Sequence, residues 1–494
     1  MVSRERRGSS ADSTFLVALV VTTAAAEVWM AWHYFGFLTG DDVEILAEAF
    51  RVAVGFKYRA WDIRSVFVPD VIVAPFVWLG AKCGLTDVRT LIVMATLPSI
   101  IAQAISTVLI YALALEFVLL PPGEGAAQRR MRGAPHPAPP SRFARRQGHP
   151  LPVGEGHRIA RVAAALFALH WIVFGFASTV YPRTIATTCI LAALSLLVRD
   201  ASALHAIAAG ALCGIAFADR FSEGVFLLPL LIAARKRAVV LAAAFAVTVA
   251  LVVGLFDFMT WGEWFGSVRK FAALTLFESD FASRLKHQSA WWYLLNLTRW
   301  FSPALLPFLW HARRERLLAA FVLIPMTALS LVAHKELRYL HGVIPFAMLL
   351  AAIGFGAMRQ RRTAIALVAI GIVWQLYGLR FLTKKSMPAV EAAQMLGADR
   401  RISAVTMSQL WAYGDRLYFT DRMAVLDIGT PPRGLAAAIR GADAVCLYES
   451  DLTPDIRATM RAGGFVPLRT FRYANAREVV VFTRSSSATS DRAP

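Results

Sequence analysis

Long apolar runs separated by short clusters of Lys and Arg make up the first three quarters of the chain. The first run extends from Phe15 to Leu38, and several others reach the length of about 20 residues that crosses a bilayer core. A soluble core of comparable size divides into domains and needs no such uncharged stretches. The first run is also too long for the apolar part of a signal peptide. The pattern therefore predicts a polytopic membrane protein with a retained first helix.

The basic clusters orient the predicted spans, because cytoplasmic loops carry an excess of Lys and Arg. Residues 1–14 and the loop 121–158 are predicted to be cytoplasmic, and the loop, rich in Arg and Pro, is predicted to be disordered. Residues 41–65, the loop 257–290 and the turn at His334 then lie outside. Spans are predicted near 159–180, 184–198, 203–219, 221–234, 238–256, 291–310, 316–333, 339–357 and 363–381.

Residues 66–120 must begin outside and end inside, so they need an odd number of crossings. They hold two apolar runs, 66–83 and 88–120, and the second contains Pro98. Either one run is re-entrant or lies on the surface, or the second run folds into two short spans. The whole chain is then expected to have roughly 11–13 crossings.

The character of the sequence changes after Lys384. The pattern predicts a small α/β domain over residues 384–484, outside the membrane, followed by a disordered tail at 485–494. This domain has no phosphate loop or catalytic motif, so a scaffold or acceptor-docking role is expected. Strands are predicted at 402–407, 424–428, 444–448 and 478–483, and helices near 434–440 and 455–462.

Composition agrees with a membrane protein. The chain is 57% hydrophobic, against about 45–50% for soluble proteins. The net charge of +19 could suggest nucleic acid, but the basic residues lie between apolar runs rather than on one domain. The four cysteines are scattered, so neither a metal site nor a disulfide framework is expected.

Two adjacent carboxylates, Asp41 and Asp42, open the first outer segment, which has the pattern of a helix lying on the membrane surface. One of them could act as a general base at the bilayer edge. Alternatively, they cap the helix and suit its dipole. On the helical wheel Asp41 falls with Glu44 and Glu48 on the predicted solvated face, so Asp42 is the preferred base.

A second cluster, His334-Lys335-Glu336-Leu337-Arg338-Tyr339, lies at the outer end of a predicted span. Lys335 and Arg338 could hold a phosphate, and Arg offers bidentate geometry. Alternatively, the cluster is an interfacial turn whose charges reach the lipid headgroups. Basic residues on the outer face run against the positive-inside trend, which favours function. Arg183 and Arg220, at predicted outer helix ends, would line the same basic pocket.

This cluster resembles the His-Lys-Glu-x-Arg-Phe signature of the membrane α-mannosyltransferases that use dolichyl-phosphate-mannose (glycosyltransferase family 22, GT-C superfamily), which have bacterial relatives. Tyr339 replaces the usual Phe, and Gly342 stands where a proline is usual. The resemblance covers residues 15–345, with the motifs in the same order. Asp41-Asp42 resembles the family's Pro-Asp-Glu segment, and the family's Trp…Ile-Arg-Ser…Pro stretch is matched by Trp61, Ile63-Arg64-Ser65 and Pro69. Tyr181-Pro-Arg183-Thr184 resembles its Arg-Thr segment, and Asp219-Arg220 resembles its Arg-Pro-Thr segment. Asp257 resembles an Asp of the family's outer loop.

The resemblance implies an all-α GT-C catalytic domain over residues 15–383, with its active site on the extracytoplasmic face. It would transfer a sugar, mannose in the family, from a polyprenyl- or dolichyl-phosphate donor to a hydroxyl of a glycan or glycolipid, with inversion. Asp42, or else Asp41, would be the catalytic base. The substrate and its phosphate would be bound by His334, Lys335, Glu336, Arg338, Arg183, Arg220 and Arg64.

Further expectations follow from the resemblance. The phosphate already activates the donor, so no cofactor and no metal are implied. The protein would lie in a bacterial inner or plasma membrane, or in the endoplasmic reticulum of a eukaryote, without a nucleic-acid partner. The alternative is a polytopic transporter or lipid-linked sugar flippase. Such a protein should show repeat-related halves with broken helices in corresponding positions, and the sequence shows no such symmetry.

Overall fold

The structure is a computed structural model that describes residues 2–33, 39–58, 62–119, 154–200, 202–277, 288–382, 387–414, 416–419, 423–429, 432, 434–473 and 476–485. Trp61, most of the predicted loop 121–158 and the predicted tail beyond Ser485 lie outside these residues. The chain forms two compact units. The first comprises Met1–Val28, Trp61–Ile72 and Leu97–Arg380, and the second comprises Trp29–Ala60, Val73–Thr96 and Phe381–Pro494.

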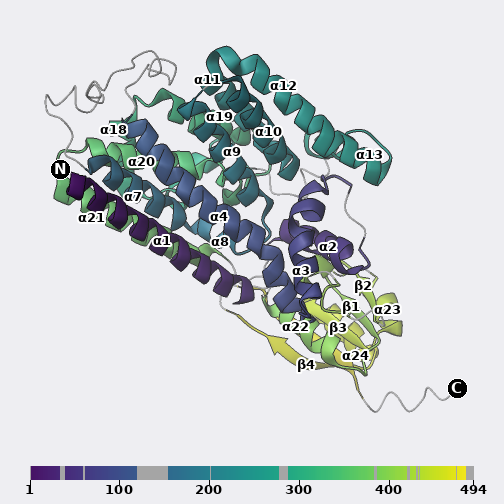
Figure 1. Cartoon of the computed structure of the whole chain (residues 1–494). Helices are drawn as coiled ribbons and strands as arrows, with labels where there is room; N and C mark the ends of the chain where they lie inside the picture. The colour runs from purple at the N-terminus through teal and green to yellow at the C-terminus, as the bar shows by residue number, and fades with distance from the viewer. Residues whose placement is uncertain are drawn as a thin grey trace. The chain divides into compact units, whose positions relative to one another are not determined.

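The first unit is entirely helical in its described part, as the apolar runs predict (Figure 1). Several helices are joined by single 3-10 or π turns rather than by long loops. The helices are α1 (Val2–His33), α4 (Val88–Leu119), α7 (Glu155–Ala168), α8 (Trp171–Ala177), α9 (Pro182–Arg199), α10 (Ala203–Asp219), α11 (Leu227–Ala234), α12 (Ala238–Val249), α13 (Phe256–Trp261), α14 (Gly266–Ala272), α16 (Trp292–Leu295), α17 (Leu297–Trp300), α18 (Leu306–Ala312), α19 (Arg316–Leu331), α20 (Ile344–Ala357) and α21 (Arg361–Gly378). The turns used below are η1 (Val68–Val73), η2 (Phe221–Phe226), η3 (Arg235–Arg237) and η7 (Leu337–Leu340).

Glycines allow α10 to pack closely on α12. A Cβ on Gly210 would lie 2.3 Å from the Leu241 carbonyl oxygen, and one on Gly214 would lie 2.7 Å from Thr248 Cβ. The two glycines are four residues apart and so share one helix face. Small residues at this spacing bring helix backbones together where lipid offers no hydrophobic force for association. α10 also packs on α9, which carries Arg183.

Four described helical stretches are long and apolar enough to cross a membrane: Ala11–His33, Val88–Val118, Phe221–Trp261 and Arg361–Phe381. The pair α7 and α8, bent by 61°, would make a fifth. The stretch Phe221–Trp261 is interrupted at η3, where Arg235 has a φ of 49° and where the sequence predicts a cytoplasmic turn. The predicted total of crossings stays a prediction.

The structure decides between the alternatives for residues 66–120. The second apolar run forms one continuous helix, α4, with Pro98 inside it. The first run forms η1 and then α3 (Ala74–Lys82). At about 1.5 Å per residue η1 and α3 together reach about 22 Å, short of a bilayer core of about 30 Å, and they are not among the described helices long enough to span it. The folding of the second run into two short spans is wrong, which leaves the re-entrant or surface-lying alternative for the first run.

The prediction of one span over 291–310 is wrong. The segment is divided among α16, α17, the 3-10 turn Pro303–Leu305 and α18. Backbone carbonyls of this segment accept hydrogen bonds from indole N–H groups of other helices: Trp171 donates to Arg299 O (2.8 Å) and Trp374 donates to Thr298 O (2.8 Å). His170 Nδ1 accepts the Ile172 N–H, so its Nε2, 2.7 Å from Trp300 O, is the donor. These tertiary bonds satisfy carbonyls that a continuous helix would have satisfied itself.

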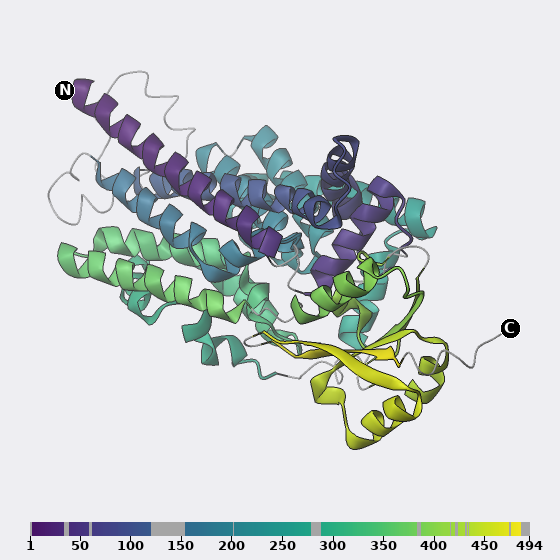
Figure 2. The ribbon, with the colours of Figure 1, turned by 90° about the horizontal axis from the view of Figure 1, so that it is seen from below.

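The second unit contains the predicted α/β domain. Its sheet has the order β2-β1-β3-β5-β4; β1 pairs in parallel with β2 and β3, and β5 pairs antiparallel with β3 and β4. Figure 2 shows β4 and β5 as yellow ribbons side by side. The predicted strands are confirmed, but β4 and α22 were not predicted. The elements are α22 (Met387–Ala398), β1 (Ala404–Met407), β2 (Ala424–Asp427), α23 (Leu435–Ala438), β3 (Ala444–Tyr448), α24 (Pro454–Ala462), β4 (Phe465–Phe471) and β5 (Val479–Arg484).

Candidate functional site

Arg183 stands at the centre of a buried polar cluster in the first unit. Pro182 at the first turn of α9 presets the backbone there and needs no N–H partner, so the helix begins with Arg183 as its second residue. Arg183 is 3% exposed, and its Nη1 donates to the Glu223 carboxylate and to Tyr339 O (3.0 Å). Its Nη2 donates to Ser222 Oγ (2.9 Å). One guanidinium thus joins α9, η2 and the segment that carries the His-Lys-Glu-x-Arg sequence.

We refer to residues 334–341 as the basic loop. α9 and the residues just before it hold this loop by two further contacts. The hydroxyl of Tyr181 donates to Arg338 O (3.2 Å), and Thr187 Oγ1 lies 2.8 Å from His341 Nδ1. Tyr181 and His341 are fully buried and lie edge to face. These contacts hold the loop through the Arg338 and Tyr339 carbonyls and through the buried His341 side chain.

Glu336 joins two of the predicted basic side chains. Its carboxylate accepts a hydrogen bond from Arg338 Nε, and its Oε1 lies 3.2 Å from His334 Nε2. Burial alone would raise the pKa of Glu336, but the hydrogen bonds from His334 and Arg338 and the charges of both outweigh burial and lower it. Glu336 therefore stays ionised. A carboxylate repels phosphate, so Glu336 fits a role in orienting Arg338 rather than in contacting the donor.

Lys335 is 2% exposed and anchors the base of the loop. Its ammonium donates to Gln288 O (3.0 Å) and to Val332 O, and the Gln288 side chain donates back to Lys335 O (3.2 Å). Burial lowers the pKa of the Lys335 ammonium. A direct contact with phosphate would require this ammonium to leave both carbonyls.

The remaining predicted basic residues lie in the same unit. Arg220 is the C-cap residue of α10 and is half-buried. Its positive charge acts on the carboxylates of both Asp219 and Glu223. Arg64 is half-buried in the turn before η1, and its role as a phosphate ligand stays a prediction. Within the described residues, no group of three or more His, Cys, Asp or Glu side chains could hold a metal ion.

Glu223 was missed by the sequence analysis. It is 1% exposed, follows Arg220 closely and opens a long apolar stretch. A lone carboxylate at membrane depth is costly and usually functional, which was the signal available in the sequence.

The candidate base lies in the second unit, at the start of α2 (Gly40–Val54). Thr39 is the N-cap, and its backbone N–H (2.9 Å) and hydroxyl (3.1 Å) both donate to Asp42 Oδ2. This is a capping box, in which the third residue of the helix satisfies the cap residue. The capping role considered from the sequence is thus observed for Asp42. Its role as base stays a prediction.

The prediction of a solvated face for Asp41 and Glu48 is wrong. Asp41 is 9% exposed, Asp42 0% and Glu48 2%. Arg51 Nε donates to both oxygens of Glu48 (3.0 and 2.9 Å), so that carboxylate is paired. α2 packs against α3 and buries most of its first three turns, so the surface-lying pattern describes only its C-terminal end.

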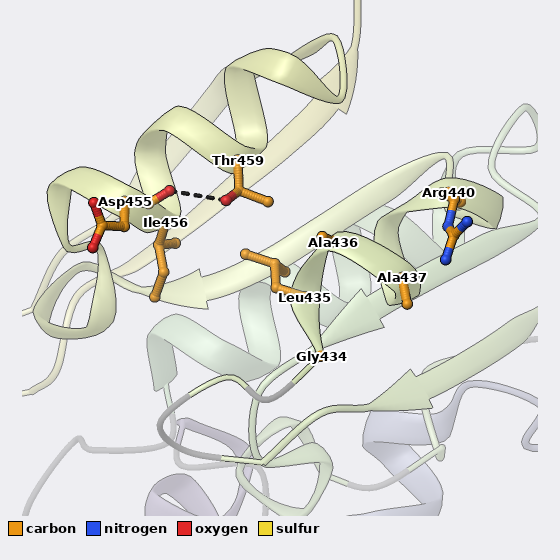
Figure 3. Close-up of a pocket in the computed structure, with 8 residues that line it drawn as sticks. All are labelled: Gly434, Leu435, Ala436, Ala437, Arg440, Asp455, Ile456 and Thr459. Carbon is orange, nitrogen blue, oxygen red and sulfur yellow. Dashed lines mark hydrogen bonds between the residues drawn. The ribbon is translucent and has the colours of Figure 1, made fainter.

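The second unit also has an open pocket of about 690 Å³ between α23 and α24 (Figure 3). Arg440 lies on one side and Asp455 on the other, with small and aliphatic side chains between them. None of the residues predicted for the site lines it. The lining residues are Gly434, Leu435, Ala436, Ala437, Arg440, Asp455, Ile456 and Thr459.

Solved structures resemble the chain over nearly its whole length. ArnT from Cupriavidus metallidurans bound to undecaprenyl phosphate aligns with a TM-score of 0.57 and 12% identity, over 94% of this chain and 97% of ArnT. ArnT in the apo state aligns with a TM-score of 0.55 and 14% identity, over 95% of this chain and 98% of ArnT. These matches confirm the GT-C fold with a small C-terminal α/β domain. No curated protein matches the chain significantly.

The match of a family model over more than half of the chain, together with the GT-C fold, defines a membrane glycosyltransferase. The sequence model of the Alg9-like mannosyltransferase family matches residues 52–391. The chain belongs to this family, as its motifs predict.

Proposed function

We propose that the protein transfers mannose from a polyprenyl- or dolichyl-phosphate-linked donor to a hydroxyl of a glycan or glycolipid, on the extracytoplasmic face of the membrane. The observation that carries this proposal is the match of the family model, whose residues 52–391 include the whole basic loop. The likeness to a transferase solved with undecaprenyl phosphate supports a lipid-phosphate donor. The donor's own phosphate is the leaving group, so the proposal needs no cofactor.

The reaction would be one displacement with inversion. The acceptor oxygen attacks the anomeric carbon as the bond from that carbon to the phosphate oxygen breaks. Asp42, or else Asp41, takes the proton of the acceptor hydroxyl, and the lipid leaves as a monophosphate. Arg338 is the proposed direct contact that stabilises charge on the departing phosphate. His334 would add hydrogen bonding, and Lys335, Arg183, Arg220 and Arg64 would add positive charge around the group.

A transfer assay tests the donor class. The purified protein is mixed with polyprenyl-phosphate-linked mannose, glucose or aminoarabinose and with a panel of glycan and glycolipid acceptors. We expect transfer from the mannose donor and release of polyprenyl monophosphate in equal amount. Transfer from another sugar donor alone would keep the fold-level assignment and overturn the choice of mannose. Transfer from a nucleotide sugar in the absence of lipid would overturn the donor class.

Cysteine labelling tests the orientation. Ala458 is exposed on α24, and Ser141 lies in the predicted cytoplasmic loop. In a background with the exposed Cys83 replaced by Ser, Ala458→Cys should react with a membrane-impermeant thiol reagent on intact cells. Ser141→Cys should react only after permeabilisation, because connecting segments rich in Lys and Arg, such as 121–158, stay in the cytoplasm. Labelling of both positions from the same side would contradict the proposed orientation.

A further inference from the structure

A carboxylate that the proposed reaction does not use is buried behind the basic loop. Glu223 is 1% exposed, and its ion pair with Arg183 is almost fully withdrawn from solvent. Burying two charges costs several kcal/mol each, and their attraction offsets this only when the geometry is good and further hydrogen bonds complete it. Replacement by apolar residues is often neutral or stabilising, so stability alone is a weak reason for such a pair.

Both terminal nitrogens of Arg183 donate to protein groups. Beyond Glu223, it reaches Tyr339 O and Ser222 Oγ, and its guanidinium carbon lies 4.8 Å from the centre of the Tyr339 ring. The guanidinium therefore holds Tyr339 by both backbone and ring. Glu223 and Ser222 accept its other hydrogen bonds and so fix its orientation.

The end of the loop packs directly on the same carboxylate. A Cβ on Gly342 would lie 2.8 Å from Glu223 Oε2 and 2.9 Å from Phe226 Cε2. This close approach explains why a glycine stands where the family usually has a proline. Tyr339 and Gly342 are thus both placed by the pair Arg183–Glu223, one through a hydrogen bond and the other through contact.

We infer that Glu223 is a positioning residue for the proposed transfer: it orients Arg183, and through Arg183 it sets the backbone of the basic loop from which Arg338 projects. Arg338 directly precedes Tyr339, so a shift of the Tyr339 carbonyl moves the Arg338 guanidinium. A misplacement of about 1 Å at a reacting group can cost about 100-fold in rate. This inference rests on the proposed function.

The test compares Glu223→Gln with the double variant Arg183→Met/Glu223→Met. Glu223→Gln keeps the size and one acceptor of the side chain but removes the charge that orients Arg183. We expect kcat/KM for the lipid-phosphate donor to fall about 10- to 100-fold. The double variant leaves no unpaired buried charge, so it should fold with nearly the thermal stability of the wild type. It still lacks the bond to Tyr339 O, and we expect it to keep the loss in kcat/KM.

Glu223→Asp should recover part of the lost activity, because it restores the charge at a slightly different position. Binding of polyprenyl monophosphate, measured without an acceptor, gives a readout of the loop that does not depend on transfer. Two results would overturn the inference and leave Arg183–Glu223 a structural ion pair. One is wild-type kcat/KM and wild-type monophosphate binding in Glu223→Gln, and the other is recovery of wild-type kcat/KM in the double variant. If the wild-type protein neither binds polyprenyl monophosphate nor transfers sugar, the proposed function fails instead.

Discussion

Asp42→Asn is expected to lower the rate of sugar transfer by about 10²- to 10⁴-fold, the usual effect of removing a general base. The amide keeps an oxygen that can accept the Thr39 N–H and hydroxyl, which Asp42 Oδ2 now accepts at 2.9 and 3.1 Å. It cannot take a proton from the acceptor. The capping box is therefore retained and the base is lost. Single-turnover transfer rates and thermal unfolding, measured on the same preparation, separate the two effects.

Two matched variants sharpen this test. Asp42→Ala removes both the base and the capping-box carboxylate that accepts from Thr39, so it should be inactive and should also lose about 0.5–2 kcal/mol of stability. Asp41→Asn alters the neighbouring carboxylate, which is not the capping-box residue of α2, and should retain most of the activity. Transfer by Asp42→Asn within a few-fold of the wild type, with destabilisation confined to Asp42→Ala, would make Asp42 a cap only. If Asp41→Asn is the inactive variant, the base is Asp41.

The sequence predicts helix ends well where charged residues terminate an apolar run. The predicted span 203–219 coincides with α10, and 316–333 differs from α19 only at its end. Both are bounded by charge or by a cap residue whose preference is local. The segment 291–310 was mispredicted because its path depends on bonds from Trp171, His170 and Trp374. Those residues are distant in sequence, so no local pattern reports them.

β4 was missed for a different reason. Its five central residues are all exposed, so the strand has no alternation of apolar and polar positions. Pro467 lies inside it, which usually argues against a strand and is tolerated here because β4 is at the edge of the sheet. The pairing with β5 that makes it a strand is a tertiary property.

The sequence could nominate residues for the candidate site, whose roles stay predictions, but it could not report their contacts. The motif marked the basic loop and Arg183 as charged residues near one place, and the structure places them together. The motif could not distinguish Lys335 and Arg183, which donate to protein groups, from Arg338, which is proposed to contact the phosphate. Lys335 donates to Gln288 O, 47 residues away in sequence, and Arg183 donates to Glu223, 40 residues away. Only the fold shows which charges are already occupied.

Arg338 is the residue for which the largest loss of donor binding is expected. Its Nε donates to Glu336, and its guanidinium carbon lies 5.8 Å from the Tyr181 ring centre and 5.7 Å from that of Tyr339. A planar guanidinium that is oriented by a carboxylate and flanked by two rings is suited to bidentate recognition of phosphate. A charge-assisted hydrogen bond contributes about 1.5–3 kcal/mol, or about 10- to 150-fold in affinity.

Arg338→Ala should therefore weaken binding of polyprenyl monophosphate by about 10- to 150-fold and lower kcat/KM for the donor at least as much. Arg338→Lys should recover only part of this, because an ammonium restores charge without the planar fork. Glu336→Gln is the matched control: it keeps the Arg338 charge but weakens its orientation, so its loss should be smaller than that of Arg338→Ala. Competition of polyprenyl monophosphate against the donor measures all three. If Arg338→Ala binds the monophosphate within two-fold of the wild type, the basic loop is an interfacial turn and the phosphate must be held elsewhere.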